Sequence, residues 1–168
     1  EEFWKHPLTW EHVQGFYRES FAQESFASFY WNLKFIIKPV WELLRSFPRM
    51  PKAHVYHSVS TGYAGFLSAV AKHRFDRPFL LSEHGIYVRE RINDLLNSEW
   101  RPSLDPDFVR PPVGVSLLRQ SWIDFFICIG KFCYHTADHV TSLFERNAQF
   151  QCEFGADRDK IEIIPNGI

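Results

Sequence analysis

Short apolar segments alternate with longer amphipathic ones after residue 52, and this pattern constrains the fold more than any other feature. Four of the apolar segments have the length and β-branched character of buried strands. In the segments between them, apolar residues recur every three or four positions, as on one face of a helix. Such alternation predicts an α/β fold with a parallel sheet flanked by helices. The expected strands are 53–60, 77–84, 138–144 and 160–165.

The first 52 residues have a different pattern. Aromatic residues recur at helical spacing through 9–46, and we expect this helical region to pack on the sheet domain, with Pro39 kinking or interrupting it. A proline-rich loop is expected at 101–112. The helices expected after residue 52 are 61–75, 89–100, one through 118–132 with Phe125, Phe126 and Phe132 in the core, and 145–156.

Composition excludes several classes of protein. Nineteen Lys and Arg residues oppose 20 Asp and Glu residues, so no basic surface for nucleic acid is expected. The three cysteines form no CxxC pair, which indicates reduced thiols and a cytoplasmic location. No apolar run approaches the roughly 20 residues of a membrane span. The chain lacks an initiator Met and stops after "IIPNGI", so we expect it to be part of a longer protein.

Polar residues follow two of the expected strands. "STG" (Ser60–Gly62) ends the first and "EHG" (Glu83–Gly85) ends the second. Ligands of parallel sheets bind beyond the carboxyl ends of the strands, so we expect the two tips to converge on one open groove. His84 is the strongest candidate there, because imidazole can bind a sugar hydroxyl or stabilise a phosphate; a purely structural histidine is the alternative.

Other candidates carry competing interpretations. His54 and His57 have HxxH spacing, but residues three apart on a strand point to opposite faces, so a metal site is not favoured and His57 is expected to orient the following loop from the sheet interior. Glu83 is either a general base or half of a buried salt bridge with an arginine. Arg89 and Arg91 suit anion recognition or a solvated helix face.

The motifs "HSVSTGYAG", "SEHGIYVRER", "WIDFF…YHTADHVTSLFERN" and "GADRDKIEIIPNGI" together resemble the N-terminal half of family 4 glycosyltransferases. They are most similar to the PelF-like subgroup linked to exopolysaccharide synthesis. The resemblance covers about 53–168, and the aromatic helical region also suits the subgroup. It implies a Rossmann-like N-terminal domain of the GT-B architecture, in which two such domains face each other across a cleft.

The resemblance also implies an activity and a site. Enzymes of this family transfer a sugar from a nucleotide donor, expected here to be a UDP-sugar, with retention of configuration and without an essential metal or cofactor. His84 matches the histidine that contacts the donor sugar, and residues 61–63 match a loop on the acceptor side of the cleft. Asn166 begins the turn into the second domain. The expected substrate-binding residues are His57, Ser60, Thr61, Gly62, Tyr63, Glu83, Gly85, Arg89, Arg91 and Asn166.

The C-terminal donor-binding domain is absent from this chain, so we expect residues 1–168 alone to be inactive. The expected partners are a nucleotide sugar, a glycan acceptor, that missing domain and, as a further option, a membrane-embedded polysaccharide synthase complex at the inner face of the membrane. Two alternatives stay open. One is a sugar-nucleotide epimerase, and the other is a non-catalytic module that binds carbohydrate or a protein partner.

Overall fold

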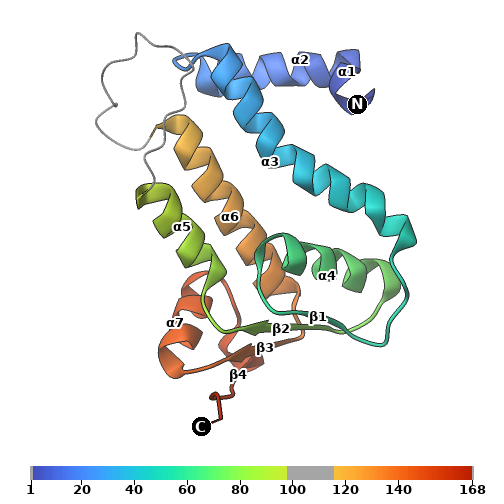
Figure 1. Cartoon of the computed structure of the whole chain (residues 1–168), viewed down its shortest axis with the longest axis vertical. Coiled ribbons are helices and arrows are strands. Elements are labelled where there is room, and N and C mark those ends of the chain that lie inside the picture. Colours follow the sequence, from blue (N-terminus) through green and yellow to red (C-terminus); the bar gives the residue numbers. More distant parts are fainter. Residues whose placement is uncertain (1, 98–115, 168) are drawn as a thin grey trace.

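A computed structural model describes residues 2–97 and 116–167, which form a four-stranded sheet with helices packed against it (Figure 1). The strands are β1 (Tyr56–Ser58), β2 (Phe79–Glu83), β3 (His139–Ser142) and β4 (Ile161–Ile163). The α-helices are α1 (Glu2–Lys5), α2 (Pro7–Phe16), α3 (Phe26–Ser46), α4 (Gly62–Phe75), α5 (Tyr87–Asn97), α6 (Leu117–Thr136) and α7 (Glu145–Glu153). The expected mixed α/β fold with a parallel sheet is confirmed.

The strands lie in the order β1-β2-β3-β4, and all neighbours are parallel. Leu81 is the register partner of Ser58 in β1 and of Val140 in β3. Each strand is shorter than the sequence predicts, although backbone hydrogen bonds such as that from Ile164 to Ser142 continue just past the strand ends. Right-handed crossovers between strands in sequential order place the connecting helices on the same face of the sheet.

The helix-covered face carries the main hydrophobic core. Residues at alternating strand positions point toward α4, α6 and α7 and are fully or almost fully buried. Phe125 and Phe132 pack against this core from α6 and Phe126 is itself buried, which confirms the expected aromatic core. The buried core residues are Ala69, Phe79, Leu81, Ile129, Cys133, Tyr134, Ala137, Val140, Ala148, Ala156 and Ile161.

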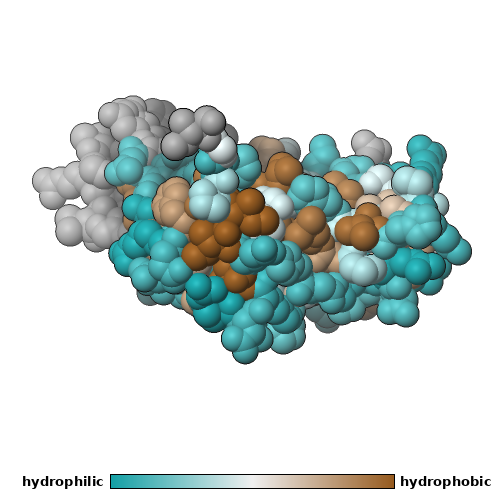
Figure 2. Space-filling model, turned by 90° about the horizontal axis from the view of Figure 1, so that it is seen from below, coloured by the Kyte–Doolittle hydropathy of each residue, from teal (hydrophilic) through white to brown (hydrophobic). Residues whose placement is uncertain are grey.

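The other face of the sheet is open within the described residues. His57 and Ser82 share a hydrogen bond of 3.0 Å there, and exposed apolar side chains flank the strands. Val59 is 71% exposed and Ile164 is 49% exposed. Seen from below the sheet, the surface shows a hydrophobic patch among hydrophilic side chains (Figure 2). Parallel sheets are normally covered on both faces, so this face is unusual for its type.

The N-terminal region packs on the sheet domain through contacts between its helix α3 and helix α6 of the sheet domain. Its aromatic rings form a second hydrophobic cluster that includes Leu118 of α6. Asn32, which is buried on α3, accepts a hydrogen bond of 2.7 Å from the Trp122 indole and donates one of 3.1 Å to Ser121. Pro39 lies inside α3 and does not interrupt it, because the helix continues to Ser46.

Several sequence expectations concern features outside the sheet. The expected proline-rich loop falls within 98–115 and therefore lies outside the described residues. In the described part of the chain, no helix combines the length and hydropathy that crossing a membrane requires. All three cysteines are free thiols, as their spacing predicted.

Candidate functional site

The polar tips of β1 and β2 meet at the carboxyl edge of the sheet, as the sequence predicted. The backbone N–H of Thr61 donates to Glu83 Oε1 at 3.3 Å, and the Thr61 hydroxyl donates to the same oxygen at 3.2 Å. These bonds tie the loop before α4 to the last residue of β2. The position of this loop is therefore set by a side chain on the neighbouring strand.

Glu83 is the centre of a buried polar network. Its second oxygen accepts hydrogen bonds from the Tyr134 hydroxyl at 2.5 Å and from Gln151 Nε2 at 3.2 Å. Only 1% of Glu83 is exposed, so the expectation that it projects into an open groove is wrong. Within residues 2–97 and 116–167, the expected salt bridge between Glu83 and an arginine is also wrong, because four neutral donors from Thr61, α6 and α7 satisfy the carboxylate instead.

Burial controls the protonation of this network. Desolvation raises the pKa of the Glu83 carboxyl above its ordinary value, although its hydrogen bonds act in the opposite direction. Burial and the nearby Glu83 charge raise the pKa of Tyr134 well above normal and that of Cys133 to about 12. The network is therefore a closed anchor that joins the end of β2 to the loop before α4 and to helices α6 and α7.

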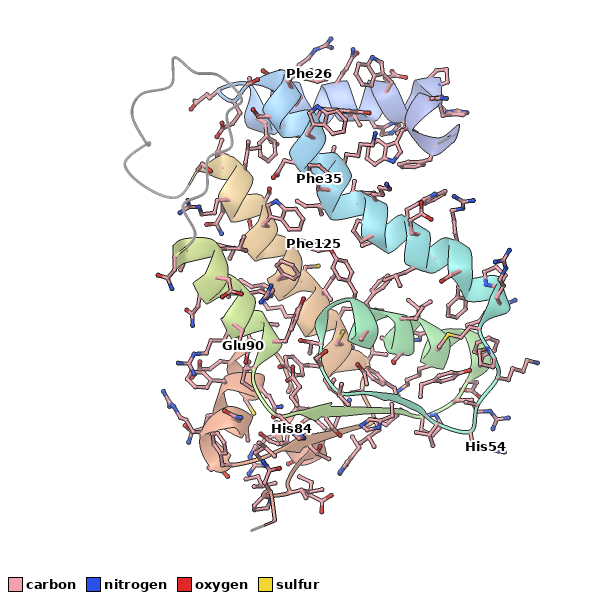
Figure 3. The ribbon with its side chains drawn as sticks, in the orientation of Figure 1. Phe26, Phe35, His54, His84, Glu90 and Phe125 are labelled. Carbon is pink, nitrogen blue, oxygen red and sulfur yellow. The ribbon has the colours of Figure 1, made fainter. Side chains whose placement is uncertain are left out.

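His84 follows Glu83 and is exposed, as predicted. Asn147 Nδ2 on α7 donates to the His84 backbone oxygen at 3.3 Å, which fixes the main chain at this point. Within residues 2–97 and 116–167, no group hydrogen-bonds the imidazole, so both ring nitrogens can face a ligand. His84 lies where β2 leads toward α5, whereas His54 lies at the opposite end of the sheet (Figure 3).

Because Gly85 has no side chain, the carboxylate of Glu90 can lie against the backbone next to His84. A Cβ atom at Gly85 would collide with the carboxylate of Glu90, which packs over this backbone from the first turn of α5. The side chain of Glu90 is exposed and approaches the backbone next to His84 (Figure 3). Glu90 is not among the site residues expected from the sequence, and Gly85, five positions earlier, was the available signal.

The loop before α4 is held tightly. Gly62 has a φ of +66°, and the ring of Tyr87 lies against the position that a Cβ would occupy. Thr61 is 1% exposed and uses its hydroxyl internally, while Tyr63 packs against Phe125 of α6. Among residues 60–63, only the first and last have partly exposed side chains that could meet a ligand.

His57 lies on the opposite face of the sheet from the Glu83 network. Its side chain occupies the open face of the sheet, so the expectation that it orients the loop from the sheet interior is wrong. The physical reason is the two-residue period of a strand, which buries Tyr56 and Ser58 and exposes the residue between them. His54 is also exposed, and no cluster of three potential metal ligands occurs among the described residues.

The remaining expected site residues occupy two regions. Arg89 stacks over the Phe150 ring on α7, with its guanidinium carbon 4.5 Å from the ring centroid. Arg91 instead pairs with Asp94 on its own helix. Asn166 is exposed in the irregular segment after β4. Arg89 therefore shares the carboxyl edge with His84, whereas Arg91 is held by its helix neighbours.

A protein-family model matches almost the whole chain. The model of the family described as "Domain of unknown function (DUF3492)" matches residues 1–159. The chain belongs to this family. A search of curated proteins found no match. The DUF3492 match includes the helical N-terminal region, strands β1 to β3, the Glu83 network and His84, whereas β4 (Ile161–Ile163) follows the matched residues.

Proposed function

We propose that this DUF3492 chain is the acceptor-side half of a retaining glycosyltransferase with GT-B architecture, similar to the PelF-like subgroup of family 4. The full protein would transfer a sugar from a nucleotide donor, expected to be a UDP-sugar, to a glycan acceptor in the cytoplasm. The association of DUF3492 with glycosyltransferase-like proteins supports this proposal. The motifs around residues 60–63 and 83–91 support the narrower PelF-like assignment.

The observation that carries the proposal is the exposed imidazole of His84 on a rigid support. The residue before it is anchored by four hydrogen bonds, and its own carbonyl is held by Asn147. A catalytic group must be positioned without depending on its substrate, and buried hydrogen bonds provide this preorganisation. The carboxyl edge of a parallel sheet is also where ligands of such folds bind.

In the proposed reaction, the bond between the anomeric carbon and the diphosphate oxygen breaks and a bond to an acceptor hydroxyl forms. The acceptor hydroxyl proton passes to an oxygen of the nucleoside diphosphate, which departs with the bonding electrons. His84 would donate a hydrogen bond to the donor sugar and stabilise the charge that develops as the diphosphate leaves. The diphosphate and ribose would be held mainly by a second domain, as the resemblance implies.

The test is His84→Ala in the full-length protein, with transfer from nucleotide sugars measured in the presence of glycan acceptors. Loss of one preorganised contact to the transition state should reduce kcat by roughly 10²–10³-fold. The matched control is His73→Ala, because His73 is an exposed histidine near the end of α4, at the opposite edge of the sheet. The control should retain the wild-type rate.

Any of three results would contradict the proposal. A folded His84→Ala variant with near-normal turnover would remove the assigned role. Conversion of a UDP-sugar to its stereoisomer without any acceptor would indicate an epimerase instead. Binding of glycan without turnover of any donor by the full-length protein would indicate a non-catalytic module.

A further inference from the structure

Two arginines from different helices share one aromatic ring beside the candidate site. The guanidinium carbon of Arg89 lies 4.5 Å from the centroid of Phe150, and that of Arg146 lies 4.4 Å from the same centroid. Arg89 belongs to the first turn of α5, and the other two residues belong to α7. The two cations are therefore at most about 9 Å apart, which is within one Debye length at 0.1 M salt.

No acidic side chain neutralises this pair within residues 2–97 and 116–167. Neither arginine has a carboxylate within ion-pair distance, and Arg146 uses one nitrogen to bind the neutral Gln149 amide at 2.9 Å. Nearby acids are engaged elsewhere. Glu145 pairs with Arg158, and the carboxylate of Glu90 packs over the backbone of residue 85.

Two further acids near the stack have partners of their own. Asp94 pairs with Arg91 on the outer part of α5, and Glu83 is buried with four neutral donors. The stack therefore keeps two positive charges close together at the surface. Stacking on an aromatic face orients a guanidinium and leaves its edge available for hydrogen bonds.

The stack lies next to His84. Asn147, the residue after Arg146, donates to the His84 backbone oxygen at 3.3 Å, so the first turn of α7 contacts the end of β2. Helix α5 begins three residues after His84. The N-terminal turns of both helices thus lie at this edge, and their partial positive charges add to those of the arginines.

We propose that Arg89 and Arg146 form an anion-binding site that takes a phosphate or carboxylate group of a molecule bound at His84. Guanidinium groups bind both anions through paired N–H donors, and a bound anion offsets the repulsion between two nearby cations. The proposed function identifies that molecule as a sugar substrate, so the anion is either the donor diphosphate or an acidic sugar of the acceptor. The anion site itself rests on the geometry of the stack alone.

The test measures binding rather than turnover, so it is independent of the proposed reaction. The 168-residue chain is titrated with pyrophosphate, with uridine diphosphate and with glucuronate, and the arginine Nε–H signals are followed by NMR. At least one anion should bind saturably and shift the signals of Arg89 and Arg146. Pyrophosphate and uridine diphosphate binding would indicate the donor, and binding of glucuronate alone would indicate an acidic acceptor.

The variants are Arg89→Gln, Arg146→Gln and the double change, with Arg74→Gln as the matched control. Arg74 is an exposed arginine in the last turn of α4, at the opposite edge of the sheet. The double variant should weaken the dissociation constant at least tenfold, and the control should change it less than twofold. A double Arg→Lys variant keeps the charge and the fold but loses the planar fork, so it should also bind more weakly than wild type.

Three results would overturn the proposal: no saturable shift of the two signals with any anion, equal binding by the double Gln variant and wild type, or an equal loss in the Arg74→Gln control. The last result would indicate general attraction to surface charge. Anion binding is measured without any sugar transfer, so failure of the glycosyltransferase proposal and failure of this one give different results.

Discussion

Removal of the Glu83 carboxylate should be among the most costly single changes in this chain. In Glu83→Ala, the N–H and hydroxyl of Thr61, the hydroxyl of Tyr134 and the amide of Gln151 all lose their acceptor. Each buried hydrogen bond contributes about 1–1.5 kcal/mol, so the free energy of unfolding should fall by roughly 4–6 kcal/mol. This is a large share of the roughly 5–15 kcal/mol that stabilises a typical domain.

Glu83→Gln separates the hydrogen bonds from the charge. The amide introduced by this substitution can keep accepting from Thr61, and Gln151 can rotate so that its oxygen, which is buried without a hydrogen-bond partner, accepts from the new NH₂ group. This variant should therefore lose less stability than the alanine variant. Any remaining difference from wild type should depend on pH, because glutamine does not titrate.

The direction of that dependence follows from the raised pKa of Glu83. Between the unfolded and the folded pKa, the folded chain binds more protons than the unfolded chain, so wild-type stability falls as pH rises through this window. Each unit of pKa elevation corresponds to about 1.4 kcal/mol. The Gln variant lacks this decline, so its stability should improve relative to wild type as pH rises above 4.5, the ordinary pKa of a glutamate.

Urea unfolding followed by circular dichroism measures the stability lost in each Glu83 variant and the pH dependence of that loss. The measurements run from about pH 4.5, the ordinary glutamate pKa, to about pH 8. Ser82→Ala is the matched control, because Ser82 is the preceding residue on β2 but points to the open face, and its loss should cost less than about 1 kcal/mol. The reasoning is refuted if the alanine variant is no less stable than this control. It also fails if the wild-type and Gln curves run parallel over the whole pH range.

Two further predictions concern the same edge of the sheet. Gly62→Ala combines a positive φ with a collision against the Tyr87 ring, so it should lower the free energy of unfolding, measured in urea, by roughly 2–4 kcal/mol. Gly15→Ala in α2, where a Cβ would meet open space, is the control and should be neutral or stabilising. Equal effects at the two glycines would contradict this prediction. The buried thiol of Cys133, with its pKa raised to about 12, should resist a thiol reagent at about pH 8 until the chain unfolds, while exposed Cys128 reacts in the native state. Thiol titration with and without urea checks this, and rapid native-state labelling of Cys133 would show that its environment is open.

The sequence was enough to predict the elements and to bring together the two strand tips that form the candidate site. Hydrophobic periodicity identified four strands in their correct order along the chain, and the rule for parallel sheets brought the tips at Thr61 and Glu83 together. Both inferences rest on local patterns, since strand and helix periods are properties of short segments. The exact strand ends and the continuation of α3 past Pro39 were harder to predict from the sequence. The strand ends depend on hydrogen bonds between strands, and the continuation of α3 depends on how that helix packs.

The roles of single side chains at the site depended on partners far away in the chain. Glu83 is buried because Tyr134 and Gln151 supply donors from α6 and α7, and no sequence pattern links those residues to position 83. The joint position of Arg89 and Arg146 beside one aromatic ring likewise arises only when α5 meets α7. Sequence periodicity therefore determined the architecture and the edge that carries the candidate histidine. The tertiary structure decided which charged groups are buried as anchors and which remain exposed to a ligand, because burial and hydrogen bonding depend on contacts between separate elements.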